Sequence, residues 1–191
     1  ALAIMQLAEA GELAVTDPVR RWLPEFRLPN RDFADRITLH HLLTHTSGLP
    51  PLPTRYYALY RSIMQDPNRD LIPLPCDISQ LRPIDTPEDL MQLLAEFEIE
   101  LLGPPGKFFS YSNEGYGLLG AVIERASGES YPEFIHTHIL EPLGMTQTAF
   151  DPEIVARFPA VTQLYSSRME GGRKVVFPTP GWWEKPAMYA C

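Results

Sequence analysis

Residues 108–120 read FFSYSNEGYGLLG and place a polar Tyr-Ser-Asn triplet between an aromatic run and an apolar segment. Two prolines and a glycine at 104–106 exclude a helix before the triplet, whereas apolar residues recur at helical spacing over 118–123. The triplet at 111–113 is therefore predicted to lie where a loop enters a helix. Unpaired backbone N–H groups and the positive end of the helix dipole lie at such a junction, so its polar side chains can face a substrate.

The residues of the triplet leave two interpretations open. The Tyr111 hydroxyl is a potential proton carrier, and the Asn113 amide can both donate and accept hydrogen bonds to a substrate. Asn113 is also a favoured residue at helix starts, so an ordinary capped helix explains the same pattern.

The composition describes a globular chain that has neither the charge of a nucleic-acid binder nor the apolar run of a membrane-spanning protein. The 191 residues suffice for one domain or for part of a larger one, and 45% of them are hydrophobic. The formal charge is −8, from 16 basic and 24 acidic side chains, and no basic cluster is longer than Arg20-Arg21, so we expect no nucleic-acid partner. No apolar run approaches the roughly 20 residues of a bilayer span, so no transmembrane segment is predicted.

Start and stop signals predict five or six helices. Residues 1–11 resemble the second half of a buried helix that carries Leu2, Met5 and Leu7 and ends at Gly11. Three further helices are expected to start at a capping residue, namely Thr38, Thr86 followed by Pro87, and Ser130 with Glu133 three residues later.

Two other segments are predicted from their prolines and glycines. Residues 51–85 contain six prolines and one helical island near 56–64, so we expect a surface excursion there. Gly171 and Gly172 separate short apolar pieces at 160–165 and 174–177, which indicates a hairpin and at most two strands.

The remaining polar candidates favour structural roles. His41 and His45 stand four apart, but no partner glutamate or further ligand cluster accompanies them, so no metal and no cofactor is predicted. Ser47 lacks the glycine two residues before it that a nucleophile elbow requires, which favours a turn. The chain starts inside a predicted helix without an initiator Met, so we expect an internal fragment.

Three blocks carry a resemblance to a known family. They are residues 37–49 (ITLHHLLTHTSGL), 105–113 (PGKFFSYSN) and 139–145 (ILEPLGM), in that family's order. Together they resemble the serine hydrolases of the class C β-lactamase family, which includes D-alanyl-D-alanine carboxypeptidases and esterases. The resemblance implies an α+β, β-lactamase/transpeptidase-like fold. Residues 1–191 would form a partial domain, truncated at both ends, that holds mainly the helical lobe with at most a short hairpin.

The resemblance also implies roles for the triplet. Tyr111 would act as the catalytic acid/base, Asn113 would assist catalysis and orient the substrate, and Ser112 would belong to the substrate-binding set while mainly filling the turn. The family's nucleophile motif, S-x-x-K, is expected before residue 1, and its third motif, K-T-G or H-x-G, beyond residue 191. No lysine of this chain stands three residues after a serine, so the fragment alone is expected to be inactive.

Two functions follow as hypotheses. The first is part of a serine hydrolase that acts through an acyl-enzyme on a β-lactam, a D-Ala-D-Ala peptide or an ester. The second is a non-catalytic relative with a peptide-binding or scaffolding role. The partner would be a small-molecule or peptide substrate, and the resemblance favours a periplasmic or extracellular location, while the oligomeric state stays open.

Overall fold

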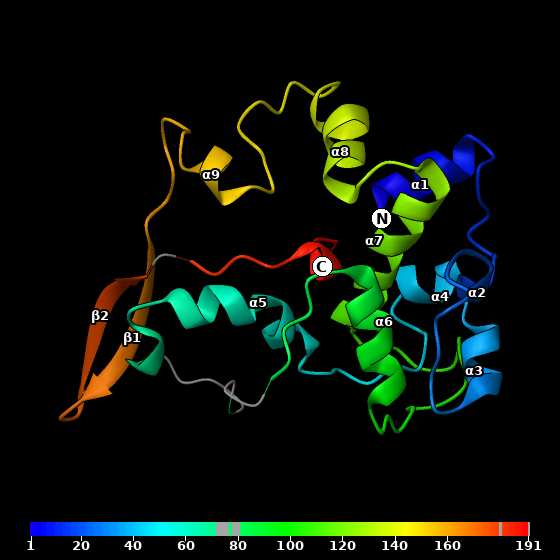
Figure 1. Ribbon diagram of the computed structural model, residues 1–191, viewed down its shortest axis with the longest axis horizontal. Helices are drawn as coiled ribbons and strands as arrows, with labels where there is room; N and C mark the ends of the chain where they lie inside the picture. The colour runs from blue at the N-terminus through cyan, green and yellow to red at the C-terminus, as the bar shows by residue number, and fades with distance from the viewer. Residues whose placement is uncertain (72–76, 78–80, 180, 191) are drawn as a thin grey trace.

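The computed structural model describes residues 1–71, 77, 81–179 and 181–190 and is mainly helical with one antiparallel hairpin (Figure 1). The α-helices are α1 Leu2–Glu9, α2 Val19–Trp22, α3 Arg31–Arg36, α4 Leu39–Leu43, α5 Thr54–Gln65, α6 Pro87–Glu96, α7 Asn113–Ser127, α8 Tyr131–Ile135 and α9 Pro152–Val155. The shorter turns are η1 Arg69–Leu71, the π-helical η3 His136–Leu140 and η4 Pro186–Met188. The strands are β1 Leu164–Glu170 and β2 Arg173–Thr179.

Helix α7 is the centre of the fold. It contacts α1, α2, α4, α6, α8 and η4, and in Figure 1 α5 extends from this cluster toward the hairpin. Nine of its 15 residues are buried. Ser112 caps its N-terminus by accepting a hydrogen bond from the Gly115 N–H, and Gly128 ends it in the left-handed conformation at φ 76°. The structure thus gives the cap to Ser112 rather than to Asn113.

Glycine lets α7 approach η4 closely. A Cβ on Gly117 would lie 2.7 Å from Leu90 Cδ2 and 2.8 Å from the Ala187 carbonyl oxygen. A Cβ on Gly115 would meet Leu42 Cδ2 at 3.5 Å, which is an ordinary contact. One face of α7 therefore requires glycine at position 117, whereas position 115 has room for a methyl group.

The predicted helix starts at Thr38, Thr86 and Ser130 are confirmed, each as a reciprocal capping box. The helical island predicted near 56–64 is confirmed as the longer α5. The middle of the 51–85 segment includes residues outside the described ranges, and its role as a surface excursion stays a prediction. Of the described helices, none is long and apolar enough to cross a bilayer.

Two details differ from the predictions. The buried side of α1 is Ala3, Ile4 and Leu7, while Leu2 and Met5 are 55% and 51% exposed, because positions 3, 4 and 7 share one helical face. The hairpin turn at Gly171-Gly172 is confirmed, but β1 begins at Leu164 rather than 160, in register with the end of β2 at Thr179.

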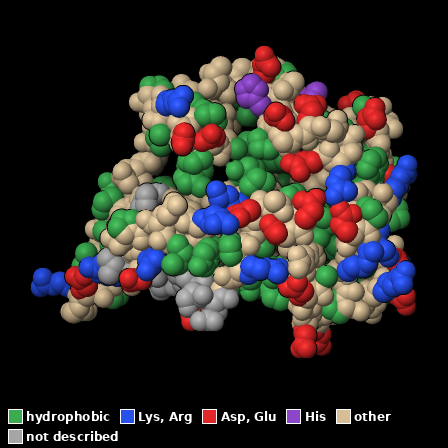
Figure 2. Space-filling model, in the orientation of Figure 1, with side chains coloured by type: hydrophobic (Ala, Val, Ile, Leu, Met, Phe, Trp, Pro, Cys, Tyr) green, Lys and Arg blue, Asp and Glu red, His purple; other side chains and the backbone are tan. Residues whose placement is uncertain are grey.

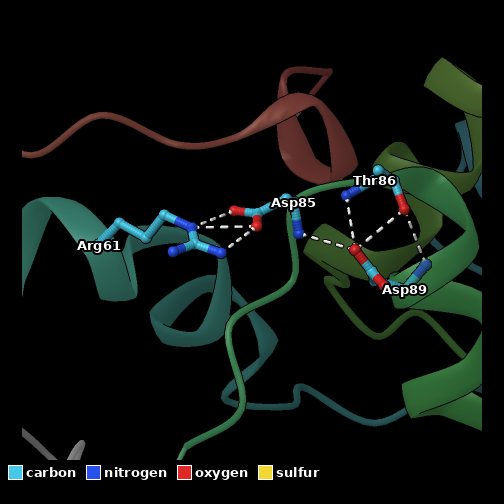
Figure 3. Close-up of polar contacts among 4 residues, drawn as sticks. All are labelled: Arg61, Asp85, Thr86 and Asp89. Atoms are coloured by element: carbon cyan, nitrogen blue, oxygen red, sulfur yellow. Dashed lines mark hydrogen bonds and ion pairs between the residues drawn. The ribbon is translucent and has the colours of Figure 1, made fainter.

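An ion pair joins α5 to the start of α6 (Figure 3). The Arg61 guanidinium donates to both carboxylate oxygens of Asp85, with Nε–Oδ1 and Nε–Oδ2 distances of 2.9 and 3.0 Å. The Asp85 N–H in turn donates to the capping carboxylate of Asp89 at 3.1 Å. The hydrogen bonds from Arg61 are the main cause that holds the pKa of Asp85 below its ordinary value.

We predict that Gly117→Ala destabilises the fold. Because the added methyl group overlaps Leu90 and the η4 backbone, the free energy of unfolding should fall by about 1–3 kcal/mol. Urea unfolding measures this, with Gly115→Ala as the matched control on the same helix. The control should leave stability unchanged or slightly increased, since alanine favours helix over glycine. Equal losses in both variants would contradict the close approach at position 117.

Acid should weaken the Arg61–Asp85 ion pair that joins α5 to the start of α6. The folded-state pKa of Asp85 is lowered, so its stabilising effect is complete above the unfolded value of about 3.9 and is lost as pH falls through the folded value. Asp85→Asn should therefore reduce stability at neutral pH and flatten the decline below about pH 4. Thermal unfolding from pH 7 to acid measures this. Asp70→Asn, whose side chain is 87% exposed, is the control and should follow the unmodified chain.

Candidate active site

The site is built where two of the three sequence blocks meet. Residues 44–49 and 102–112 run side by side. Three backbone hydrogen bonds join them: Leu102 N–H to Gly48 O at 2.9 Å, Gly106 N–H to Thr46 O at 2.7 Å, and Ser110 N–H to His45 O at 2.8 Å. Ser47 is buried within this pairing and its hydroxyl accepts from the Leu49 N–H at 3.3 Å, which confirms the predicted turn role.

Tyr111 lies at the end of this paired loop, two residues before α7. Its side chain is 57% exposed, and its ring centroid lies 4.5 Å from that of His45. Within the described part of the chain, no hydrogen bond involves the Tyr111 hydroxyl. The ring is thus supported by the protein while more than half of the residue stays exposed to solvent.

Asn113 and Ser112 occupy the helix start itself. Asn113 is the first residue of α7 and is half-buried, so it lies at the positive end of the helix dipole. Ser112 is 1% exposed; its hydroxyl accepts from the Gly115 N–H at 3.2 Å and donates to Glu114 at 2.7 Å. This agrees with the turn-filling role expected of Ser112, and direct contact between Ser112 and a substrate stays a prediction.

Glu114 is a buried carboxylate that the sequence reasoning did not select. Its side chain is fully buried, and its two oxygens accept hydrogen bonds from the hydroxyls of Ser112 and Thr54. It lies in the first turn of α7, where the helix dipole favours negative charge. The sequence does contain a signal for this burial. Glu114 is followed directly by a stretch of glycine and hydrophobic residues, 115–123 (GYGLLGAVI), in the same predicted helix.

The two candidate histidines have separate structural tasks. His41 Nδ1 accepts from the Thr38 N–H at 3.2 Å in the α4 capping box, whereas His45 lies beyond the end of α4 and its Nδ1 accepts from the Ser112 N–H at 3.2 Å. Burial is the main cause that lowers the pKa of each ring. The described residues contain no group of three or more His, Cys, Asp or Glu side chains that could hold a metal ion.

One large cavity among the described residues is lined by no residue of the triplet. About 700 Å³ lie between α8, η3, α9 and the segment around Tyr189, and Figure 2 shows a hollow over these elements. Helix α8 follows the C-terminal end of α7, and the 15 residues of α7 span roughly 22 Å. The cavity is thus bounded by elements that follow α7 in the chain, whereas Tyr111 precedes this helix.

Comparison with known proteins assigns the fold. The octameric penicillin-binding protein homologue from Pyrococcus abyssi superposes with a TM-score of 0.70 at 37% identity, over 94% of this chain and 36% of that chain. The α-helical cluster with its short hairpin thus has the β-lactamase/transpeptidase-like fold that the resemblance implied.

The family follows from the sequence match. The chain belongs to the β-lactamase family, whose model, described as Beta-lactamase, matches residues 1–187. Esterase EstB of Burkholderia gladioli is 37% identical over 182 residues, which cover 93% of this chain and 43% of that protein. Penicillin-binding protein 4* of Bacillus subtilis is 35% identical over 148 residues, which cover 78% of this chain and 27% of that protein. The chain thus spans less than half the length of these relatives. Members of the family are serine hydrolases that act on β-lactams, peptides or esters.

We predict that Thr54→Val destabilises the helix start at the site. Valine keeps the shape of the fully buried threonine but removes one hydroxyl donor from the Glu114 carboxylate. Since hydrogen bonds to charged groups contribute about 1.5–3 kcal/mol, the free energy of unfolding should fall by that amount. Chemical denaturation measures it, and Thr137→Val in the exposed η3 turn is the control. Equal stability of Thr54→Val and the unmodified chain would show that Glu114 does not depend on this donor.

Proposed function

We propose that this chain is part of a serine hydrolase that forms an acyl-enzyme with a β-lactam, a D-Ala-D-Ala peptide or an ester and then transfers the acyl group to water. In this proposal Tyr111 is the catalytic acid/base, Asn113 assists catalysis and orients the substrate, and Ser112 holds the turn between them. The chain supplies the helical lobe and one wall of the active-site cleft.

The observation that carries the proposal is the exposed Tyr111 side chain at the buried start of α7. The ring packs on His45 and the following residue caps the helix, so the hydroxyl has a defined position while it stays accessible. A group that transfers a proton must lie within hydrogen-bond reach of the reacting atoms, and a rigid support with an open polar end meets that need. Asn113, next along the helix start, is placed to bind a polar group of the same substrate.

The chemistry requires groups from outside these 191 residues. A tyrosine with an ordinary pKa near 10 becomes an effective base only beside a cation that favours its anion. The three lysines are Lys107, Lys174 and Lys185, and none follows a serine by three positions. We therefore propose that another part of the protein supplies the S-x-x-K nucleophile and the K-T-G or H-x-G motif.

The second candidate function is a non-catalytic relative that binds peptides or serves as a scaffold. The same site would then hold a ligand without an acyl-enzyme. The coding sequence upstream of residue 1 separates the two, because the hydrolase requires a serine three residues before a lysine there. Absence of that pair would leave the binding role.

In the complete protein, Tyr111→Phe should lower kcat/KM for the active substrate by about 10²- to 10⁴-fold, because it removes the proton carrier and keeps the ring. Stopped-flow assays with nitrocefin, p-nitrophenyl esters and a D-Ala-D-Ala peptide measure this, and thermal unfolding checks the fold. Tyr60→Phe on α5 is the matched control and should retain activity. Wild-type rates in Tyr111→Phe would remove Tyr111 from the mechanism.

The 191-residue chain should give no burst with any of these substrates and no covalent adduct with a labelled penicillin. The acyl group needs a nucleophilic serine, and by the proposal this serine lies elsewhere in the protein. Covalent labelling of the chain by itself would place the nucleophile within residues 1–191 and overturn this assignment.

A further inference from the structure

The conformation of His45 is unusual for a residue with a side chain. Its φ is 54°, and within the described ranges it is the single non-glycine residue with positive φ. This left-handed region is disfavoured for residues with a Cβ, although histidine enters it more readily than most. Such a conformation persists only where surrounding contacts hold it, and it is often found at functional sites.

The contacts that hold His45 come from both sides of Tyr111. Its carbonyl oxygen accepts from the Ser110 N–H at 2.8 Å, and its ring Nδ1 accepts from the Ser112 N–H at 3.2 Å. One residue therefore binds the backbone immediately before and immediately after the proposed proton carrier. The left-handed backbone at position 45 allows carbonyl and ring to reach these two neighbours together.

The imidazole also supports the Tyr111 side chain. Its centroid lies 4.5 Å from the Tyr111 ring at an interplanar angle of 32°, and 5.0 Å from the Tyr116 ring at 24°. Tyr116 is itself anchored, because its hydroxyl donates to the Leu43 carbonyl oxygen at 3.2 Å. The Tyr111 ring thus rests on an imidazole whose position is set by α4, α7 and the backbone.

The hydrogen bonds define the protonation state that this arrangement needs. Nδ1 can accept from the Ser112 N–H only when it carries no proton, so the neutral ring bears its hydrogen on Nε2. Burial lowers the pKa of His45, which favours the same neutral form. A ring protonated at Nδ1 would direct a second donor at the Ser112 N–H and break this contact.

We propose that His45 is a positioning residue for proton transfer by Tyr111: as a neutral imidazole with its hydrogen on Nε2, it holds the turn at 110–112 and the plane of the Tyr111 ring. The inference rests on the proposed function of Tyr111. His45 itself does not contact the reacting atoms; it limits the Tyr111 hydroxyl to one position from which the proton passes to and from the substrate. Misplacing a catalytic group by about 1 Å can cost 10²-fold in rate.

Two variants of the complete protein separate the contribution of the His45 ring from that of its hydrogen-bond acceptor. His45→Asn keeps a side-chain acceptor and a residue that tolerates positive φ but removes the ring, whereas His45→Phe keeps a ring and removes the acceptor. Each should lower kcat by about 10- to 100-fold with little change in KM, because the substrate contacts remain. His136→Asn, at an exposed histidine of η3, is the matched control and should retain kcat.

A double-mutant cycle tests whether His45 acts through Tyr111. In the Tyr111→Phe background, His45→Asn should change the residual rate by no more than about twofold, because the proton carrier is already absent. ¹⁵N NMR of the His45 ring should show Nδ1 without a proton and Nε2 with one. A purely structural role would instead give additive losses in rate together with a loss of thermal stability in both backgrounds.

The outcomes distinguish this inference from the proposed function. If Tyr111→Phe abolishes activity while both His45 variants retain kcat, the positioning role is overturned and the hydrolase proposal stands. If Tyr111→Phe retains activity, the catalytic assignment of Tyr111 fails, and the positioning role fails with it even where NMR confirms the tautomer. A rise in KM with kcat unchanged would make His45 a substrate-binding residue and also overturn the inference.

Discussion

The structure depends on one buried carboxylate, Glu114, at the start of α7. A fully buried charge is costly unless hydrogen bonds and a favourable field compensate for lost water. Both are present, since Ser112 and Thr54 donate to its oxygens and the helix dipole is positive there. Because Thr54 begins α5 and Ser112 caps α7, the compensation of this charge requires both helices to start at the same place.

This constraint explains why the proposed catalytic groups lie at one end of α7. From Gly117 to Ile123 the helix is buried against its neighbours, so its middle cannot present polar groups to a ligand. Its far end at Gly128 leads directly into the α8 capping box. Solvent access and the oriented N–H groups of the first turn come together only where the chain enters the helix, and the triplet spans that entry, with Tyr111 exposed just before α7 and Asn113 as its first residue. Gly117 permits the close packing of α7 against Leu90 and Ala187, which helps to exclude solvent from the middle of the helix.

The sequence predicted those features whose causes are local. Capping residues at Thr38, Thr86 and Ser130 act within three or four positions, so the pattern of residues contains the whole interaction. The fold class and family followed from three blocks that resemble known hydrolases. The burial of Glu114 and the conformation of His45 were missed, because their partners lie 60 and 67 residues away. The exposure of Leu2 and Met5 was missed because an apolar side chain alone does not say which helical face is covered.

The three blocks behind the family resemblance have different physical meanings in the folded chain. Residues 37–49 and 105–113 hydrogen-bond to each other and together form the support of Tyr111. The third block, 139–145, begins in the last two residues of η3, which follows α8, and is mostly exposed, with Leu143 at 65%. It makes no described hydrogen bond to the triplet. A resemblance spread over three blocks thus identifies the fold as a whole, but only the first two blocks meet at Tyr111, the proposed proton carrier. For this reason His45, whose carbonyl oxygen and ring contact both neighbours of Tyr111, belongs with Tyr111 in the proposed site.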